Sequence, residues 1–209
     1  MANTELRVVT VLFADLVGFS TSAETANAES TRALLETYFA TCRTIIERYG
    51  GTIEKFIGDA VMAVWGYPVA GEDAAERAVR AGLDLIEAVE QPLRVGITTG
   101  TVAVASASTA SDSLVAGDTV NLAARIQQIA LAGEVWTDQA TRDSARDSID
   151  FEDRGTQVVK GRSQPVALSV AIAVMGERGG RGRLDVLNVP LVGYKREVSA
   201  IKDALHATM

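Results

Sequence analysis

Cysteine is nearly absent from this sequence of 209 residues, which contains only Cys42. A single cysteine cannot form a disulfide within the chain, and it excludes a cysteine-rich metal site. Because disulfides are typical of oxidising compartments, this usage predicts a cytoplasmic protein. Histidine is equally rare: His206 lies near the end of the sequence, and we do not expect it to act in catalysis.

Long hydrophobic runs and an excess of basic residues are also missing. The longest apolar run, "VALSVAIAVM" at residues 166–175, is far shorter than the roughly 20 residues that a membrane-spanning helix needs. The N-terminus does not resemble a secretion signal. The net charge of −7 and the pI near 4.8 argue against a broad basic face for nucleic acid. We therefore predict neither a membrane nor a nucleic-acid partner, and we expect any phosphate chemistry to need local cations or a metal.

What the sequence does contain is an alternation of strand and helix patterns. Residues 9–13 form a continuous apolar run, typical of a strand covered on both faces. Apolar residues then recur at helical spacing over residues 28–49 and 72–89. Between these helices "TIEKFIGDAVMAVWG" predicts a β-hairpin, and "LRVGITTGTVAVAS" predicts the strand that follows the second helix. The order β-α-β-β-α-β predicts an α+β fold of ferredoxin-like type, with helices on one face of the sheet.

The next part of the chain extends this unit. Residues 106–116 are small and polar and predict a loop or projecting arm. Asp118 is expected to open a helix that stops before Gly133. We then expect a strand at "EVWT", a short helix at "DQATRDSAR", and a closing hairpin made of "TQVVKG" and "QPVALSVAIAV".

Two aspartates stand at the ends of predicted strands. Asp15 follows the run 9–13, and Asp59 lies in the turn of the predicted hairpin. In a β-α-β-β unit these strands can be neighbours, so the two carboxylates can converge at one end of the sheet. Two close carboxylates repel unless a divalent cation lies between them, and hard oxygen ligands suit Mg²⁺ or Mn²⁺. The pair favours two-metal phosphoryl chemistry, whereas Asp59 alone would more often be a plain turn residue and Asp15 alone could equally be one.

A second group of polar residues lies later in the sequence. Asn121 and Arg125 are four residues apart on a predicted helix and so share one face. An amide and a guanidinium that project together can hold a sugar and a developing phosphate charge, although such a pair is also common on solvated helix faces. Lys55 and Lys160 lie on strand-like segments near glycine and could pair with a base or with phosphate oxygens. The plain alternatives are a strand-edge lysine and an ordinary hairpin residue.

Five sequence blocks, in this order and at these separations, resemble the class III adenylate/guanylate cyclase catalytic domain: "VTVLFADLVGFS", "GGTIEKFIGDAVMAVWG", "GITTG", "AGDTVNLAARIQ" and "VVKGRSQPVAL". The resemblance covers residues 6–174. It implies a mostly antiparallel central sheet with flanking helices. It also implies conversion of a nucleoside triphosphate to a 3′,5′-cyclic nucleotide and pyrophosphate, with two Mg²⁺ or Mn²⁺ ions per active site. The sites would lie at the interface of a head-to-tail homodimer.

The resemblance assigns the first group of residues to the metals. Asp15 and Asp59 match the metal-binding aspartates of the family. The backbone of Leu16, Gly18 and Phe19 matches the segment that contacts the metal and the triphosphate.

The resemblance assigns the second group to the nucleotide. Asn121 and Arg125 match the pair that orients the ribose and stabilises the transition state. Lys55 matches the lysine that reads the adenine edge, and Lys160 matches a lysine that reaches the terminal phosphates. In that arrangement one subunit supplies the metal site and the other supplies the base-reading lysine, the asparagine and the arginine.

One position departs from the family pattern. The second base-selecting residue, usually Asp or Thr in adenylate cyclases, falls at Leu114. Leucine can neither accept from the adenine amino group nor donate to guanine, which weakens base selection by hydrogen bonding. Asp112 could supply the missing acceptor if the loop bulges. Lys55 still favours ATP, since guanylate cyclases tend to carry an acid at that position.

The sequence therefore predicts an adenylate cyclase, with two alternatives left open. One is a guanylate or mixed-specificity cyclase, and the other is a catalytically weak nucleotide-binding regulatory module. A phospho-acceptor receiver domain also places acids at strand ends, but it would need an alternating β-α repeat, whereas Asp59 lies in a predicted hairpin.

The predicted domain organisation has three parts. Residues 1–175 form the cyclase domain, and residues 176–189 form a linker rich in glycine and arginine. Residues 190–209 resemble the start of an ATPase domain that is itself absent from the sequence.

Overall fold

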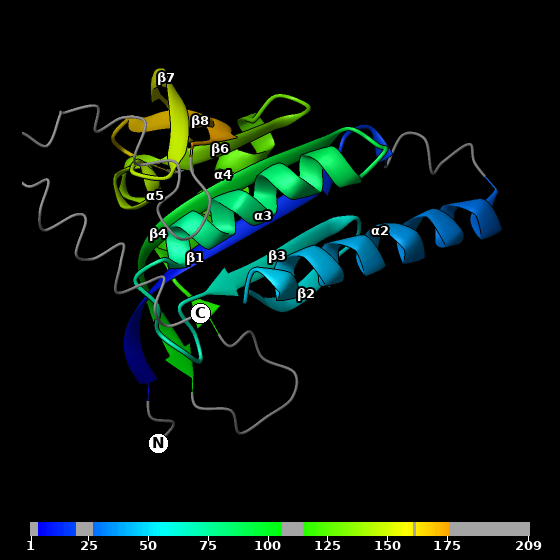
Figure 1. Cartoon of the computed structure of the whole chain (residues 1–209), viewed down its shortest axis with the longest axis horizontal. Helices are drawn as coiled ribbons and strands as arrows, with labels where there is room; N and C mark the ends of the chain where they lie inside the picture. Colours follow the sequence, from blue (N-terminus) through cyan, green and yellow to red (C-terminus); the bar gives the residue numbers. More distant parts are fainter. Residues whose placement is uncertain (1–3, 20–26, 106–114, 161, 176–209) are drawn as a thin grey trace, which may run out of the picture. The chain divides into compact units, whose positions relative to one another are not determined.

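One mixed sheet organises the elements of this protein (Figure 1). The computed structural model describes residues 4–19, 27–105, 115–160 and 162–175. The predicted linker and C-terminal segment thus lie outside the described residues. Along the chain the elements are β1 (Thr4–Leu16), α2 (Ala28–Arg48), β2 (Thr52–Ile57), β3 (Ala60–Trp65), α3 (Ala74–Ala88), β4 (Leu93–Ala105), β5 (Val115–Ala116), α4 (Asp118–Ile129), β6 (Glu134–Asp138), α5 (Gln139–Ala145), β7 (Ile149–Gln157) and β8 (Val166–Val174).

The strand order confirms the predicted α+β fold. The strands lie in the order β2-β3-β1-β4-β6-β8-β7, with β5 paired to β4. The first four of these are the ferredoxin-like arrangement, in which every neighbouring pair is antiparallel. Among the described strand pairs only β4 and β6 run parallel, because α4 crosses from one to the other.

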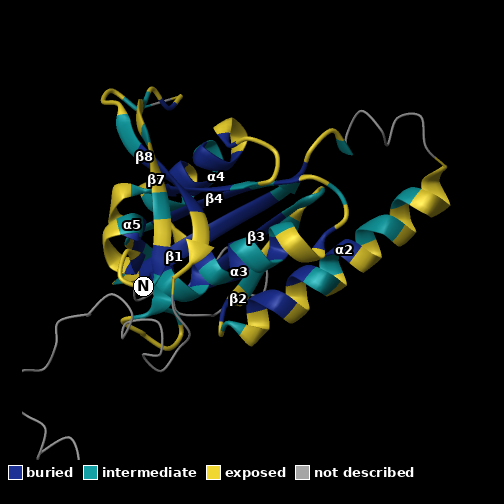
Figure 2. Cartoon of the chain, turned by 45° about the horizontal axis from the view of Figure 1, so that its top comes forward, coloured by how far each residue is buried: buried dark blue, intermediate teal, exposed yellow. Residues whose placement is uncertain are grey.

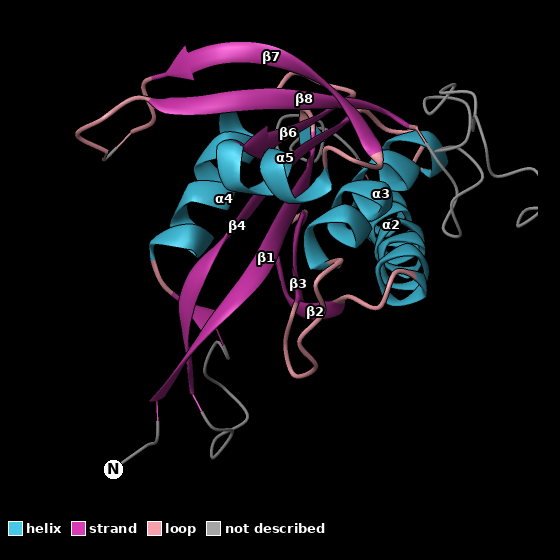
Figure 3. Ribbon diagram, turned by 60° about the vertical axis from the view of Figure 1, so that its left-hand side comes forward, coloured by secondary structure: helices cyan, strands magenta, loops and turns pink. Residues whose placement is uncertain are grey.

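Helices cover both faces of β1, with α4 on one side and α2 and α3 on the other (Figure 3). Leu12, Ala14 and Leu16 are buried in a core with α2 and α3. The odd-numbered residues, such as Val11 and Phe13, pack with residues of α4 on the opposite face. The central strands are thus covered on both faces, which explains the continuous apolar run of the sequence. Asp15, the next odd-numbered residue, lies on the α4 face.

Helix α2 is anchored to the sheet by its second half (Figure 2). Asn27 caps its start by accepting a hydrogen bond from the backbone N–H of Glu29 at 3.1 Å. Its buried residues Tyr38, Cys42, Ile45 and Ile46 all lie toward the C-terminal end. Burial raises the pKa of the Cys42 thiol to about 12, so this cysteine is a core residue and not a reactive one.

The structure differs from the predicted elements at three places. β1 does not stop before Asp15 but continues to Leu16, because β4 is equally long and pairs with it from Thr4 to Leu16. The first strand of the closing hairpin is β7, which begins earlier than the predicted "TQVVKG" and shares only Thr156 and Gln157 with it. As the edge strand β7 exposes one side to solvent and carries charges that mask its strand pattern. The last two residues of the predicted loop form β5, while residues 106–114 lie outside the described part.

No described helix combines the length and the apolar character needed to cross a membrane.

Candidate active site

Asp15 meets a cation and an amide near the end of β1. In the sheet register it lies opposite Arg94 of β4, and Arg94 Nη2 donates to Asp15 Oδ2 at 2.9 Å. Gln127 of α4 donates to the same oxygen from Nε2 at 3.1 Å. A carboxylate whose side chain is only 19% exposed is thereby held by one charged and one neutral donor, which offsets its loss of hydration.

Asp59 approaches Asp15 from the turn between β2 and β3. Gly58 allows this tight turn, because its φ of +63° is in the left-handed region. The pairing of β1 with β3 places Ala14 opposite Val61, which brings the turn beside Asp15. Burial raises the pKa of Asp59, and so do the negative charge of Asp15 and a hydrogen bond between the two carboxyl groups, while Arg94 opposes the shift.

The two aspartates therefore lie together, as the sequence predicts. Among the described residues no group of three or more histidine, cysteine, aspartate or glutamate side chains could hold a metal. Two carboxylates nevertheless fit Mg²⁺ or Mn²⁺, since such ions are commonly bound by one or two carboxylates together with waters and substrate phosphates.

The segment after Asp15 turns sharply away from the sheet. Leu16 is buried at the end of β1, and the next backbone N–H donates to the carbonyl of Pro92 at 2.8 Å. Gly18 adopts a φ of +75°, and a Cβ atom at this position would meet no atom of the described residues within 4 Å. Phe19 packs against the core beneath α2 and α3. Within the described part of the chain, the turn therefore leaves the backbone of Gly18 uncovered.

Asn121, Arg125 and Lys160 gather around α4. Asn121 is exposed and Arg125 is half-buried on this helix. The loop that carries the exposed Lys160 is held to α4 in two ways: Val159 packs in the cluster of Leu122, and Arg162 forms an ion pair with Asp118. The last contact joins the "VVKGR" and "AGD" segments, which are 44 residues apart.

Of the two predicted base-reading positions, Lys55 lies within the described residues and Leu114 does not. Lys55 is exposed on β2, the edge strand, at an irregularity in its pairing with β3. The sheet order separates β2 from β4 by two strands. Leu114 and Asp112 lie outside the described residues.

Sequence reasoning missed both donors to Asp15. Arg94 is the one charged residue of β4, between the buried residues Leu93 and Val95, and a charge in such surroundings needs a partner. Gln127 is a polar residue on the buried side of α4, in line with Ala123 one turn earlier. Both were visible as polar residues in apolar patterns, but the pattern does not identify their partner.

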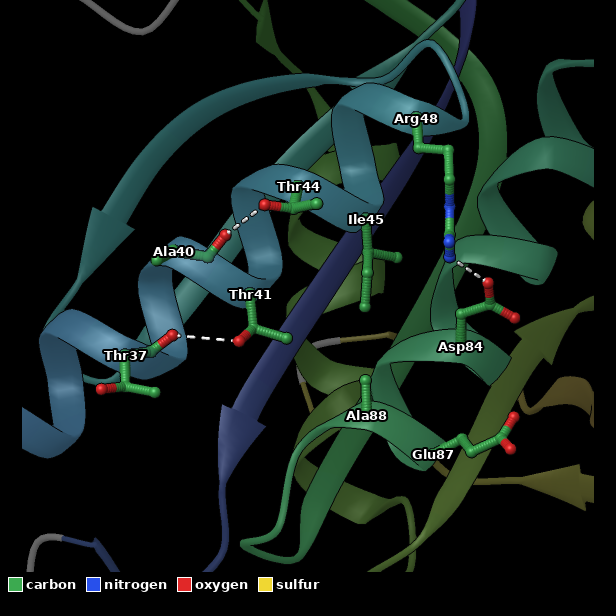
Figure 4. Close-up of a pocket in the computed structure, with 9 residues that line it drawn as sticks. All are labelled: Thr37, Ala40, Thr41, Thr44, Ile45, Arg48, Asp84, Glu87 and Ala88. Carbon is green, nitrogen blue, oxygen red and sulfur yellow. Dashed lines mark hydrogen bonds and ion pairs between the residues drawn. The ribbon is translucent and has the colours of Figure 1, made fainter.

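A groove of about 800 Å³ lies away from these residues, between α2 and α3 (Figure 4). The hydroxyls of Thr37, Thr41 and Thr44 donate to carbonyls of their own helix, and Arg48 pairs with Asp84 across the groove. None of the predicted site residues lines it, and we assign it no ligand.

Comparison with known proteins places this arrangement in a family. Residues 1–171 match the family described as "Adenylate and Guanylate cyclase catalytic domain". The chain is 32% identical over 185 residues to "Adenylate cyclase 1" of Rhizobium meliloti (strain 1021), which covers 80% of this chain and 28% of the relative. The chain spans about a third or less of the first curated relatives that it matches.

Two solved structures have the same architecture. The adenylyl cyclase CyaB from P. aeruginosa is 30% identical with a TM-score of 0.78, over 84% of this chain and 98% of that one. The guanylyl cyclase Cya2 is 29% identical with a TM-score of 0.78, over 86% of this chain and 98% of that one. The matched family model, the fold and the five sequence blocks agree: this chain belongs to the class III adenylate/guanylate cyclase catalytic domains.

Proposed function

We propose that this chain converts ATP to 3′,5′-cyclic AMP and pyrophosphate at the interface of a head-to-tail homodimer. The observation that carries the proposal is the contact between Asp15 and Asp59, in which burial and the negative charge of Asp15 raise the pKa of the Asp59 carboxyl group and so favour a cation beside it. Asp15 and Asp59 would hold Mg²⁺ or Mn²⁺, which when bound neutralises the triphosphate and acidifies the attacking ribose 3′-hydroxyl.

The other residues act on the nucleotide. Asn121 orients the ribose so that its 3′-hydroxyl is in line with the α-phosphorus. Arg125 donates to the charge that develops on the phosphoryl oxygens, which contributes about 3 kcal/mol, the usual loss when one preorganised donor is removed. Lys160 pairs with the terminal phosphates and stabilises the departing pyrophosphate.

The geometry of α4 supports a site shared between two chains. Gln127 points inward to Asp15 on the buried side of the helix. At 3.6 residues per turn, Arg125 points about 160° away from Gln127, and Asn121 lies on the exposed side with Arg125. Asn121 and Arg125 therefore face away from the aspartates of their own chain, and a second chain would bring a complementary pair to them.

The test of this function is product formation by the purified chain with Mn²⁺, supplied separately with ATP and with GTP. Cyclic AMP as the main product supports the proposal. Cyclic GMP formed from GTP at a similar rate would support the mixed-specificity alternative. Leu114 favours that alternative because its side chain cannot hydrogen-bond to either base. Nucleotide binding by a folded dimer without any cyclic product would favour the regulatory-module alternative.

Lys55→Glu is expected to reverse base preference. The carboxylate can no longer donate to the acceptor edge of adenine, and it can accept from the N–H groups of guanine. We expect the ratio of ATP to GTP turnover to fall about 100-fold, since a lost hydrogen bond to a charged group is worth roughly 1.5–3 kcal/mol. Lys55→Ala is the matched variant: it should lose ATP turnover without gaining GTP turnover. An unchanged ratio in both variants would exclude Lys55 from base reading.

A further inference from the structure

Gln127 carries a buried side-chain amide that takes no part in the proposed reaction. Its exposure is 5%, and the neighbouring inward positions Leu122, Ala123 and Ile126 are apolar. Burying an amide among apolar residues is unfavourable unless it is hydrogen-bonded, so a leucine would suit the packing equally well. Its Nε2 donates a hydrogen bond to Asp15. This bond explains why a glutamine, and not an apolar residue, occupies the position.

The hydrogen bond selects one oxygen of Asp15. Arg94 and Gln127 both donate to Oδ2, at 2.9 and 3.1 Å. Two N–H donors occupy both lone pairs of that oxygen, so Oδ1 is the oxygen that remains to accept a cation. Arg94 supplies charge from the sheet, whereas Gln127 supplies a neutral donor from the helix.

Helix α4 packs directly against the backbone of β4 at this point. Gly96 of β4 lies directly beneath α4, and a Cβ atom there would be 2.3 Å from the backbone nitrogen of Gln127 and 2.6 Å from the carbonyl oxygen of Ala123. Glycine alone permits this approach. A displacement of α4 must therefore move the Gln127 amide, and with it the donor that orients Asp15.

The same helix carries Asn121 and Arg125 on its outer side. If the sites are shared between two chains, these residues serve one active site while the Asp15 of their own chain serves the other. We propose that Gln127 is a positioning residue that orients Asp15 for the cation and links, through α4, the two active sites of the dimer. This inference rests on the proposed function.

The first test measures Mn²⁺ binding by calorimetry, without nucleotide, for Gln127→Leu and for Gln128→Leu, its exposed neighbour on α4. We expect the dissociation constant to rise about tenfold or more in Gln127→Leu, as is usual when a residue that orients a metal ligand is removed, and to stay unchanged in Gln128→Leu. The melting temperature of Gln127→Leu should fall only slightly, because leucine suits the packing at this position and Asp15 keeps its charged donor, Arg94. A dissociation constant within twofold of the parent chain would overturn the orienting role. If the parent chain itself binds no Mn²⁺ without nucleotide, the inference fails, whereas the proposed function is decided separately by cyclic AMP formation.

The second test separates the effect of Gln127 on the site that contains its own Asp15 from its effect on the site that contains its own α4. A heterodimer of an Asp59→Ala chain and an Asn121→Ala chain has one complete site, to which the first chain gives α4 and the second gives the aspartates. Gln127→Leu in the second chain should raise the Mn²⁺ concentration needed for half-maximal activity. In the first chain it should lower kcat severalfold at saturating Mn²⁺ and leave the Mn²⁺ requirement unchanged. No effect in the first chain would overturn the link between the sites.

Discussion

Asp59→Asn is expected to reduce cyclic AMP formation by about 10³-fold and, at the same time, to stabilise the metal-free protein. The loss of activity follows because one of the two carboxylates that would hold the cations is removed. The gain in stability follows because the pKa of Asp59 is raised by burial and by the neighbouring charge of Asp15, so that its ionised form is unfavourable in the folded state.

The pH dependence of this gain has a definite sign. A carboxyl group with a raised pKa binds its proton more tightly in the folded than in the unfolded state. The parent chain therefore loses stability as the pH rises from the ordinary pKa of 3.8 through the raised pKa of the folded state. Asp59→Asn does not suffer this loss, so it should be the more stable protein at pH 7, and the difference should vanish below about pH 4.

Urea unfolding at pH 7 and at the acid end, with and without Mn²⁺, measures both effects. Mn²⁺ should stabilise the parent chain more than the variant, because the cation binds only where both carboxylates are present. Asp150→Asn, which removes an exposed carboxylate on β7, is the matched control and should change neither activity nor stability. A variant that is less stable than the parent chain at pH 7 would contradict the account of Asp59.

Mixing the two inactive variants Asp59→Ala and Asn121→Ala is expected to restore activity. Each variant alone has a defect in both sites of its homodimer. In a heterodimer both defects fall in the same site, and the other site is complete. At equal amounts half of the dimers are mixed, and each has one of two sites intact, so about a quarter of the parent activity should return.

The matched control for this experiment is a mixture of Asp15→Ala with Asp59→Ala. Both defects then lie in the aspartate half-site, so no heterodimer contains a complete site and activity should stay absent. Product formation is measured after co-expression, to allow chains to exchange. Restoration in the control mixture, or failure of the first mixture to regain activity although it contains heterodimer, would exclude shared sites.

The sequence alone specified most of the elements and the two groups of site residues. The helical spacing over residues 28–49 and the hairpin around Asp59 are local patterns, and local patterns are enough to predict α2, β2 and β3. The ferredoxin-like order followed from these elements, because few topologies connect them without crossing. From that order it could be expected that Asp15 and Asp59 meet.

Only the tertiary structure decided how Asp15 is held. Its two donors, Arg94 and Gln127, are 79 and 112 residues away along the chain, and neither is related to it by a local repeat. The register between β1 and β4 brings Arg94 opposite, and the close packing of α4 on Gly96 brings Gln127 within reach. The same long-range pairing extends β1 through Asp15 and places β7 before the predicted hairpin strand. Strand and helix periods repeat within a few residues and can be recognised in the sequence, whereas register and helix placement depend on the packing of distant segments, which the sequence by itself does not display.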